Sequence, residues 1–179
     1  GICISTAGMG DPVSGSIFHA GPTIPDYQGT CWKRFLGEAY HLPVEVENDV
    51  NCAGLAEALS GAGRGCRSVL TLTIGTGIGA AFYLKEKGRE GIYHGFSNAA
   101  CEVGYMDLGE PERFEAVAST SALCRRVAEA KGESAELWDG RRIFAAAKGG
   151  DVTCIEAIDH MVDLLGRGLA NLAYVLNPE

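Results

Sequence analysis

A glycine-rich loop between two apolar strands narrows the choice of fold more than any other feature of this 179-residue chain. Residues 69–74 (VLTLTI) are apolar and β-branched, 75–79 read GTGIG, and 80–84 are apolar again. A dinucleotide-binding loop has the pattern G-x-G-x-x-G and opens a helix, whereas a second strand is expected here. The sequence therefore predicts a β-hairpin. Its glycines would let backbone N–H groups approach phosphate oxygens, with the Thr76 hydroxyl as a further donor, although glycines also form simple turns.

The rest of the pattern predicts strands early in the chain and helices later. We expect strands at 2–6 and 44–47 and helices at 30–40, 49–60, 121–131 and 141–148, followed by a long last helix capped by Asp151. Ser119, Thr120 and Asp139 are the other capping candidates. We interpret 7–12 and 85–98 as loops. The last helix is expected to bury one face, formed by Ile155, Ile158, Val162, Leu165, Leu169, Leu172 and Leu176. This order favours two α/β lobes that divide near 61–68.

Residues 47–51 (ENDVN) place two carboxylates and two amides between a strand and a helix. This set is suited to holding a sugar hydroxyl through Asn48 while Asp49 accepts its proton. Asp49 is equally well suited to cap the helix that follows, and both interpretations can hold because a capped helix start fixes the carboxylate.

A third group of polar residues comprises Glu102, in the run E-V-G-Y that ends at Tyr105, and Glu115. Paired carboxylates accept hydrogen bonds from neighbouring sugar hydroxyls, whereas a lone glutamate is usually a solvated surface residue. The four histidines, His19, His41, His94 and His160, lack ligand-like spacing and are interpreted as surface or structural residues.

Charge and cysteine content exclude several classes of protein. Fifteen basic against 23 acidic residues, with no basic run, make nucleic acid and anionic membranes unlikely partners. Seven scattered cysteines, never spaced C-x-x-C, indicate neither a disulfide framework nor a zinc site. No apolar run approaches the ~20 residues that span a bilayer. We therefore expect a soluble, cytoplasmic protein, and its abrupt ends suggest an excerpt of a longer one.

Read in order, several motifs of the chain resemble the ROK (repressor, open reading frame, kinase) family of sugar kinases and sugar-responsive regulators. They are ISTAG, LPVEVENDVNCAGLAEALSGAG, LTIGTGIGAAF, ACEVGYM, FEAVASTSAL and GLANLAYVLNPE. The resemblance implies an α/β, actin-like ATPase fold of the hexokinase and RNase H type, with two lobes around a cleft for ATP and sugar. We expect 1–63 to be part of the N-terminal lobe and 64–179 part of the C-terminal lobe.

The resemblance also implies roles for individual residues. Asp49 matches the catalytic base, and Gly75, Thr76 and Gly77 match the second phosphate loop. The sugar-binding positions correspond to Asn48, Glu102, Tyr105 and Glu115. The implied reaction transfers phosphate from ATP, with Mg²⁺, to a sugar hydroxyl, most simply the 6-OH of a hexose or β-glucoside.

Departures from the family pattern shape these expectations. Tyr105 stands where many members have a zinc-binding histidine, and 106–114 contain no cysteine, so we expect a zinc-free branch with no metal site. Ala7 replaces a usual proline, and Thr23 stands where an asparagine often contacts sugar. The first phosphate motif, D-x-G-x-T, and the adenosine-binding segment are absent, so we expect this chain alone to be inactive.

Three functions remain open at this point. The first is an ATP-dependent sugar kinase, expected to be a homodimer. The second is a non-enzymatic, sugar-sensing transcriptional regulator, which would need sugar affinity but no base; Asp49 and the missing zinc ligands favour the kinase. The third is a degenerate paralogue that pairs with an intact subunit.

Overall fold

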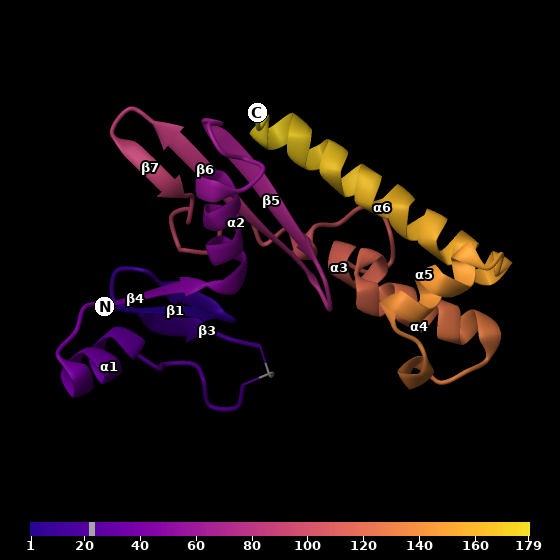
Figure 1. Cartoon of the computed structure of the whole chain (residues 1–179), viewed down its shortest axis with the longest axis horizontal. Helices are drawn as coiled ribbons and strands as arrows, with labels where there is room; N and C mark the ends of the chain where they lie inside the picture. The colour runs from indigo at the N-terminus through magenta and orange to yellow at the C-terminus, as the bar shows by residue number, and fades with distance from the viewer. Residues whose placement is uncertain (22–23) are drawn as a thin grey trace. The chain divides into compact units, whose positions relative to one another are not determined.

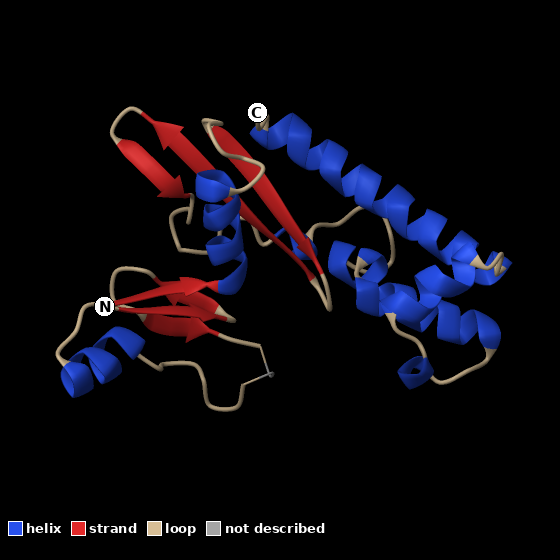
Figure 2. Ribbon diagram, in the orientation of Figure 1, coloured by secondary structure: helices blue, strands red, loops and turns tan. Residues whose placement is uncertain are grey.

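The computed structural model describes residues 1–21 and 24–179, and strands give way to helices along the chain (Figures 1 and 2). The strands are β1 (Ile2–Thr6), β2 (Met9–Asp11), β3 (Ser16–His19), β4 (Val44–Asn48), β5 (Ser68–Ile74), β6 (Ile78–Glu86) and β7 (Arg89–Ile92). The α-helices are α1 (Trp32–Tyr40), α2 (Asp49–Ser60), α3 (Phe114–Ala118), α4 (Thr120–Lys131), α5 (Gly140–Lys148) and α6 (Val152–Leu176). Two short 3-10 helices are η1 (Val103–Tyr105) and η2 (Ala135–Leu137).

The contacts within the chain group its residues into two compact units. One comprises Gly1–Thr71, Ala81–Cys101 and Glu179, and the other comprises Leu72–Ala80 and Glu102–Pro178. The assignment of 1–63 and 64–179 to the two lobes of a complete fold stays a prediction. No helix in the described part of the chain combines the length and apolarity needed to cross a membrane.

In the first unit, β1 and β4 pair in parallel, from Ile2 opposite Val44 to Thr6 opposite Asn48. Val44 and Val46 are buried while Glu45 between them is exposed, which is the alternation of a half-buried strand. The expected strands at 2–6 and 44–47 and the helices at 30–40 and 49–60 are therefore confirmed. The parallel register brings the C-terminal ends of both strands to the same edge, where α2 begins.

Two expected loops prove to contain strands. Residues 9–11 form β2, which pairs antiparallel with β3, and β6 continues to Glu86 and pairs with β7. The β6–β7 turn is made by Lys87 and Gly88, whose φ of 85° suits glycine. Across it, Glu90 accepts hydrogen bonds from the Tyr83 hydroxyl at 2.8 Å and the Lys85 ammonium at 3.2 Å. Backbone ladders and polar cross-strand pairs form these strands, so apolar alternation does not reveal them.

The expected hairpin around the glycine loop is confirmed, because β5 and β6 are neighbours in a three-stranded sheet of order β5-β6-β7. Residues 75–77 connect the two strands, and no helix follows the loop. The glycine loop therefore lies at a hairpin tip, which is the context that distinguishes it from a dinucleotide-binding loop.

The second unit is mainly helical, and its core lies between α4, α5 and α6. Its buried members are Leu123, Val127, Ala128, Trp138, Ile143, Cys154, Ala157 and Met161. Three side chains cap these helices as expected: Ser119 accepts from the Ala122 N–H, Asp139 from the Arg142 N–H and Asp151 from the Cys154 N–H. The caps explain why the sequence located these helix starts well.

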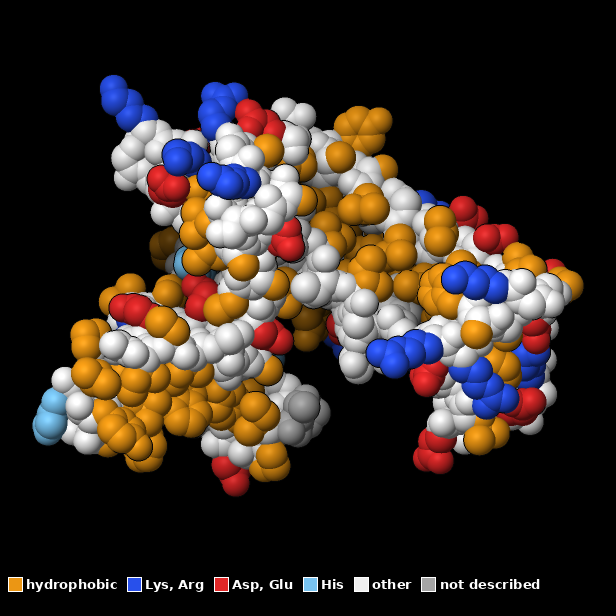
Figure 3. All heavy atoms as spheres, in the orientation of Figure 1, with side chains coloured by type: hydrophobic (Ala, Val, Ile, Leu, Met, Phe, Trp, Pro, Cys, Tyr) orange, Lys and Arg blue, Asp and Glu red, His pale blue; other side chains and the backbone are white. Residues whose placement is uncertain are grey.

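The expected buried face of α6 is confirmed in part. Leu172 is buried, and Ile158, Leu165 and Leu176 are partly buried, the first two against the core. The expectation is wrong at Ile155, Val162 and Leu169, which remain 38–57% exposed. The fully buried residues of the helix are Cys154, Ala157, Met161, Leu164, Gly168 and Leu172. The helix carries two apolar stripes, and the one with smaller residues allows close packing. At Gly168, an added Cβ would lie 2.4 Å from Cζ of the buried Phe114. Exposed apolar side chains also gather on and just after α1, at Phe35, Tyr40 and Leu42 (Figure 3).

Candidate functional site

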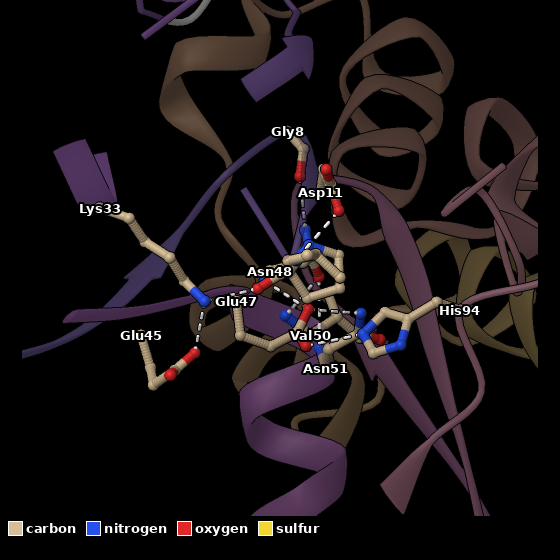
Figure 4. A network of polar contacts seen from close by, with 11 residues as sticks. Gly8, Asp11, Lys33, Glu45, Glu47, Asn48, Val50, Asn51 and His94 are labelled. Atoms are coloured by element: carbon tan, nitrogen blue, oxygen red, sulfur yellow. Dashed lines mark hydrogen bonds and ion pairs between the residues drawn. The ribbon is translucent and has the colours of Figure 1, made fainter. Parts of the chain in front are cut away.

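The junction between β4 and α2 is built by Asn48. Its backbone is extended, with φ −61° and ψ 146°, and its Oδ1 accepts hydrogen bonds from the N–H groups of Val50 at 2.9 Å and Asn51 at 3.2 Å. Its Nδ2 donates to the Gly8 carbonyl at 3.1 Å (Figure 4). Asn48 therefore caps α2 and ties the helix start to the turn after β1.

The expectation that Asp49 is the N-cap is thus wrong. Asp49 is already the first residue of α2, and the capping geometry requires the extended residue before it. The Asp49 side chain is exposed, and its Oδ1 lies 3.0 Å from the Val50 N–H. Because Asn48 supplies the principal cap, the Asp49 carboxylate is held at a fixed helix start and remains open to solvent.

A carboxylate network behind this junction was not foreseen from the sequence. Glu47 Oε1 accepts from the Asn48 N–H and from Asn51 Nδ2, both at 2.9 Å, and Oε2 lies 2.7 Å from His94 Nε2. Burial raises the pKa of Glu47, but the hydrogen bonds from His94, Asn51 and Asn48 outweigh it and hold that pKa below its ordinary value. The carboxylate is therefore ionised at neutral pH and accepts only, so His94 Nε2 donates. The sequence-based interpretation of His94 as a structural histidine agrees with this bond.

The phosphate-loop candidates Gly75, Thr76 and Gly77 form the tip of the β5–β6 hairpin. The Gly75 N–H donates to the Gly77 carbonyl at 2.9 Å, and the Gly75 carbonyl accepts from the Thr120 N–H, also at 2.9 Å. The loop is thereby bonded to the first residue of α4, whose N-terminus carries the positive end of the helix dipole. No atom lies within 4 Å of a Cβ placed on Gly75, so the backbone there is open to a ligand.

A cavity of about 520 Å³ lies beside this loop, within the second unit. Its lining comes from the hairpin tip, the start of α4, η2 and the start of α5: Gly75, Thr76, Thr120, Ser121, Cys124, Ala135, Glu136, Trp138, Asp139 and Gly140. Ligand pockets commonly have volumes of roughly 300–1,000 Å³. The open glycine backbone, the helix N-terminus and this volume together fit a nucleotide with its phosphates at the loop.

Glu115, at the start of α3, packs against two glycines. A Cβ on Gly77 would lie 2.7 Å from Glu115 Oε2, and one on Gly104 would lie 3.1 Å from the same atom. Arg113, which the sequence reasoning did not single out, has its Nε 3.6 Å from Glu115 Oε1 and its guanidinium 4.5 Å from the centre of the Tyr105 ring. The second unit thus brings together Gly77, Tyr105 and Glu115, with Arg113 between the last two.

The candidate residues therefore fall into two groups. Asn48 and Asp49 belong to the first unit, and Glu102, Tyr105, Glu115 and the loop 75–77 to the second. Glu102 immediately precedes η1. Thr23 lies outside the described residues. Within 1–21 and 24–179, no cluster of three His, Cys, Asp or Glu side chains is arranged to hold a metal ion.

Comparison with known proteins places these features in a family. Residues 2–179 match the ROK family. The chain is 47% identical over its whole length to an uncharacterised protein of Clostridium perfringens, of which it covers 59%, and 33% identical to a β-glucoside kinase of Klebsiella pneumoniae, covering all of this chain and 61% of that protein. The chain thus spans about three-fifths of the length of these relatives.

Solved structures show the same likeness. A ROK family glucokinase of Streptomyces griseus, in complex with glucose and AMPPNP, is 28% identical with a TM-score of 0.80, over 97% of this chain and 60% of that one. A ROK family transcriptional regulator, a homologue of the E. coli MLC protein, is 25% identical with a TM-score of 0.72, over 99% and 47%.

These likenesses confirm the expected α/β, actin-like ATPase fold, of which the chain covers a part. The chain belongs to the ROK family.

Proposed function

We propose that the protein containing this chain is an ATP-dependent sugar kinase. The observation that carries the proposal is the β4–α2 junction, where Asn48 caps the helix and leaves the Asp49 carboxylate exposed at a fixed place. A carboxylate held in this way is suited to accept a proton from a hydroxyl as that oxygen attacks phosphorus. The family includes members named as sugar kinases, which supports this assignment.

In the proposed reaction, Asp49 orients a sugar hydroxyl and takes its proton, and the hydroxyl oxygen attacks the γ-phosphorus of ATP in line with the departing ADP. Mg²⁺ bound to the ATP phosphates would neutralise the charge that develops on the transferred group. Asn48 has its Oδ1 and one Nδ2 hydrogen engaged in the helix cap and in Gly8. Its second Nδ2 hydrogen is therefore the one assigned to the sugar.

The second unit is proposed to supply the remaining sugar contacts and the donor site. Glu102, Tyr105 and Glu115 would bind sugar hydroxyls, and the loop Gly75, Thr76 and Gly77 would hold ATP phosphates. Because the Gly75 N–H already donates to the Gly77 carbonyl, the donors assigned to the phosphates are the N–H groups of Thr76 and Gly77 and the Thr76 hydroxyl. The adjoining cavity of about 520 Å³ begins at the loop that would hold the phosphates, and it is assigned to the part of ATP next to them. The adenosine end is not assigned to this chain, because the segment expected to bind it is absent here. No zinc is assigned, since the segment 105–114 contains neither histidine nor cysteine.

The proposed substrate is a hexose or a β-glucoside, and the group that is phosphorylated is its 6-OH. Relatives named glucokinase and β-glucoside kinase support both sugars, and the E-x-G-Y form of the motif makes β-glucosides a contender beside the hexoses. We assign the protein to the cytoplasm, where ATP is available, and propose that it forms a homodimer. We assign no nucleic acid or membrane as a partner of this region. These assignments concern the complete protein.

A sugar-sensing regulator is the second candidate, because a ROK family transcriptional regulator shares the fold. A sensor needs sugar affinity and no base. The exposed Asp49 carboxylate favours the kinase.

The test is sugar binding and phosphorylation by the complete protein. The sugars are glucose, N-acetylmannosamine, N-acetylglucosamine, fructose, allose and cellobiose, and the variants are wild type, Glu102→Ala and, as a control, Glu112→Ala, an exposed glutamate paired with Arg125. A sugar at 100 times its Kd should stabilise the protein by about 2.7 kcal/mol, which is a clear shift of the thermal midpoint. We expect one sugar to shift the midpoint and to release ADP from ATP, and Glu102→Ala alone to lose both effects.

Two other outcomes would contradict the proposal in different ways. A midpoint shift without ADP release would identify a sugar sensor. If no sugar shifts the midpoint or releases ADP in the complete protein, phosphorylation of these sugars is excluded as the function.

A further inference from the structure

The Glu47 side chain connects three parts of the chain: the end of β4, the first turn of α2 and the loop that contains His94. Through Oε1 it fixes the Asn48 N–H and the Asn51 side chain, both at 2.9 Å, and through Oε2 it binds His94 Nε2 at 2.7 Å (Figure 4). The Glu47 and His94 side chains are only 26% and 24% exposed. A short, partly buried bond to an ionised acceptor is of the stronger kind, and this one joins residues distant in sequence.

His94 in turn anchors the segment 93–101. Its carbonyl accepts from the Ala100 N–H at 3.1 Å, which closes the segment into a loop. Within that loop, Asn98 and Cys101 adopt left-handed φ angles of 56° and 64°. Left-handed backbone is costly for residues other than glycine and persists where surrounding contacts impose it. The loop leads directly into Glu102.

We propose that Glu47 and His94 form a positioning pair for sugar phosphorylation. Neither residue touches substrate in this proposal. The pair fixes the backbone before Asp49 and, through His94, the shape of the segment 93–101 of the same unit. The inference rests on the proposed kinase function, because it concerns how the proposed base is held.

The same strand offers a matched comparison. Glu45 precedes Glu47 by two residues and binds Lys33 Nζ at 2.8 Å, and its side chain is 72% exposed. This pair ties β4 to α1, and the Lys33 ammonium also donates to the Pro12 carbonyl, so its side-chain bonds do not involve Asn48, Asn51 or the segment 93–101. Loss of Glu45 therefore removes an ion pair from β4 without touching the junction.

The experiment measures kcat and KM for sugar and for ATP in the complete protein. The variants are His94→Ala, His94→Gln, Glu47→Ala, the double variant Glu47→Ala/His94→Ala, and Glu45→Ala as control. We expect His94→Ala to lower kcat/KM for the sugar roughly tenfold or more, because small displacements of reacting groups are expensive. KM for ATP should stay within about twofold. His94→Gln should recover most of the loss, because a glutamine amide donates from nearly the position of Nε2.

Non-additivity gives a second criterion. If the two residues act through one bond, the double variant should lose little more than Glu47→Ala alone. Glu45→Ala should match wild type. Full activity of His94→Ala, equal losses in Glu45→Ala, or additive losses in the double variant would each overturn the positioning pair.

Hydrogen exchange separates this proposal from the proposed function. In His94→Ala, amides of peptides covering 47–53 and 93–102 should exchange faster, and those of 32–42 should not. If wild type phosphorylates no sugar, the kinase function fails, while unchanged exchange would by itself overturn the pair. If wild type is active and His94→Ala is equally active, the pair fails and the kinase function stands.

Discussion

At the residue scale, the neighbours Asn48 and Asp49 have different roles at the start of α2. Asn48 accepts from the N–H groups of both Val50 and Asn51 and so supplies the principal cap of the helix. Asp49 adds only the contact of its Oδ1 with the Val50 N–H, at 3.0 Å, and its side chain stays exposed at a helix start that Asn48 holds. A base placed in this way needs little reorganisation before reaction.

This division leads to a prediction for Asp49→Asn in the complete protein. Sugar affinity should stay within severalfold, because an amide still hydrogen-bonds a hydroxyl and the Asn48 cap is intact. Turnover should fall about 10²- to 10⁴-fold, which is the usual contribution of general-base catalysis. Calorimetry with sugar and a steady-state assay would measure the two quantities, with Asp163→Asn on the exposed side of α6 as control. Turnover at the wild-type level would remove Asp49 as the base.

At the element scale, α6 carries two apolar stripes, and the size of their side chains decides which stripe is buried. The stripe that includes Gly168 and Ala157 faces α3 and the α4–α5 core, because small residues let helices approach closely. The stripe with Ile155, Val162 and Leu169 is left at the surface of this chain.

Two glycines of α6 therefore respond oppositely to alanine. At Gly168 the new Cβ would meet the ring of the buried Phe114, and we expect a loss of about 1–3 kcal/mol in the free energy of unfolding. At Gly166 no atom lies within 4 Å, and we expect a gain of up to about 1 kcal/mol from helix propensity. Denaturant unfolding of the complete protein with each variant measures both. Equal shifts for the two variants would contradict the packing described for Gly168.

Local signals in the sequence located most of the elements. The capping residues Ser119, Asp139 and Asp151 located helix starts, and the β-branched run before the glycine loop indicated the hairpin. What local signals missed depends on distant partners. The strand β7 forms by pairing with β6, and the buried side of α6 is chosen by the elements packed against it. The bond between Glu47 and His94 spans 47 residues of sequence, so no spacing within either segment reveals it.

At the scale of the whole molecule, the candidate residues occur in two compact units. The first holds the proposed base, and the second holds the phosphate loop and the glutamates. The proposed reaction names residues of each unit, and the relatives are longer than this chain, so each kinetic test is set in the complete protein.

Metal removal is the corresponding whole-molecule prediction. A chelator, followed by its removal and the return of Mg²⁺, should leave the thermal midpoint and the turnover unchanged, because the zinc-binding side chains of other family members are replaced at Tyr105 and missing from 106–114. Differential scanning calorimetry and the ADP-release assay measure the two. An irreversible loss of either would reveal a structural metal.

The contact of Glu115 with Gly77 and Gly104 has a consequence for how this chain can evolve. A methyl group at 77 would displace the carboxylate, and one at 104 would meet the backbone oxygen of Ile78 at 2.5 Å. The first change would move a carboxylate proposed to bind sugar, and the second would press on the backbone of β6. The residues at 77, 104 and 115 therefore constrain one another, because the Glu115 carboxylate fits only where 77 and 104 carry no side chain. A lineage that adopts a new substrate by replacing Glu115 gains freedom at 77 but none at 104.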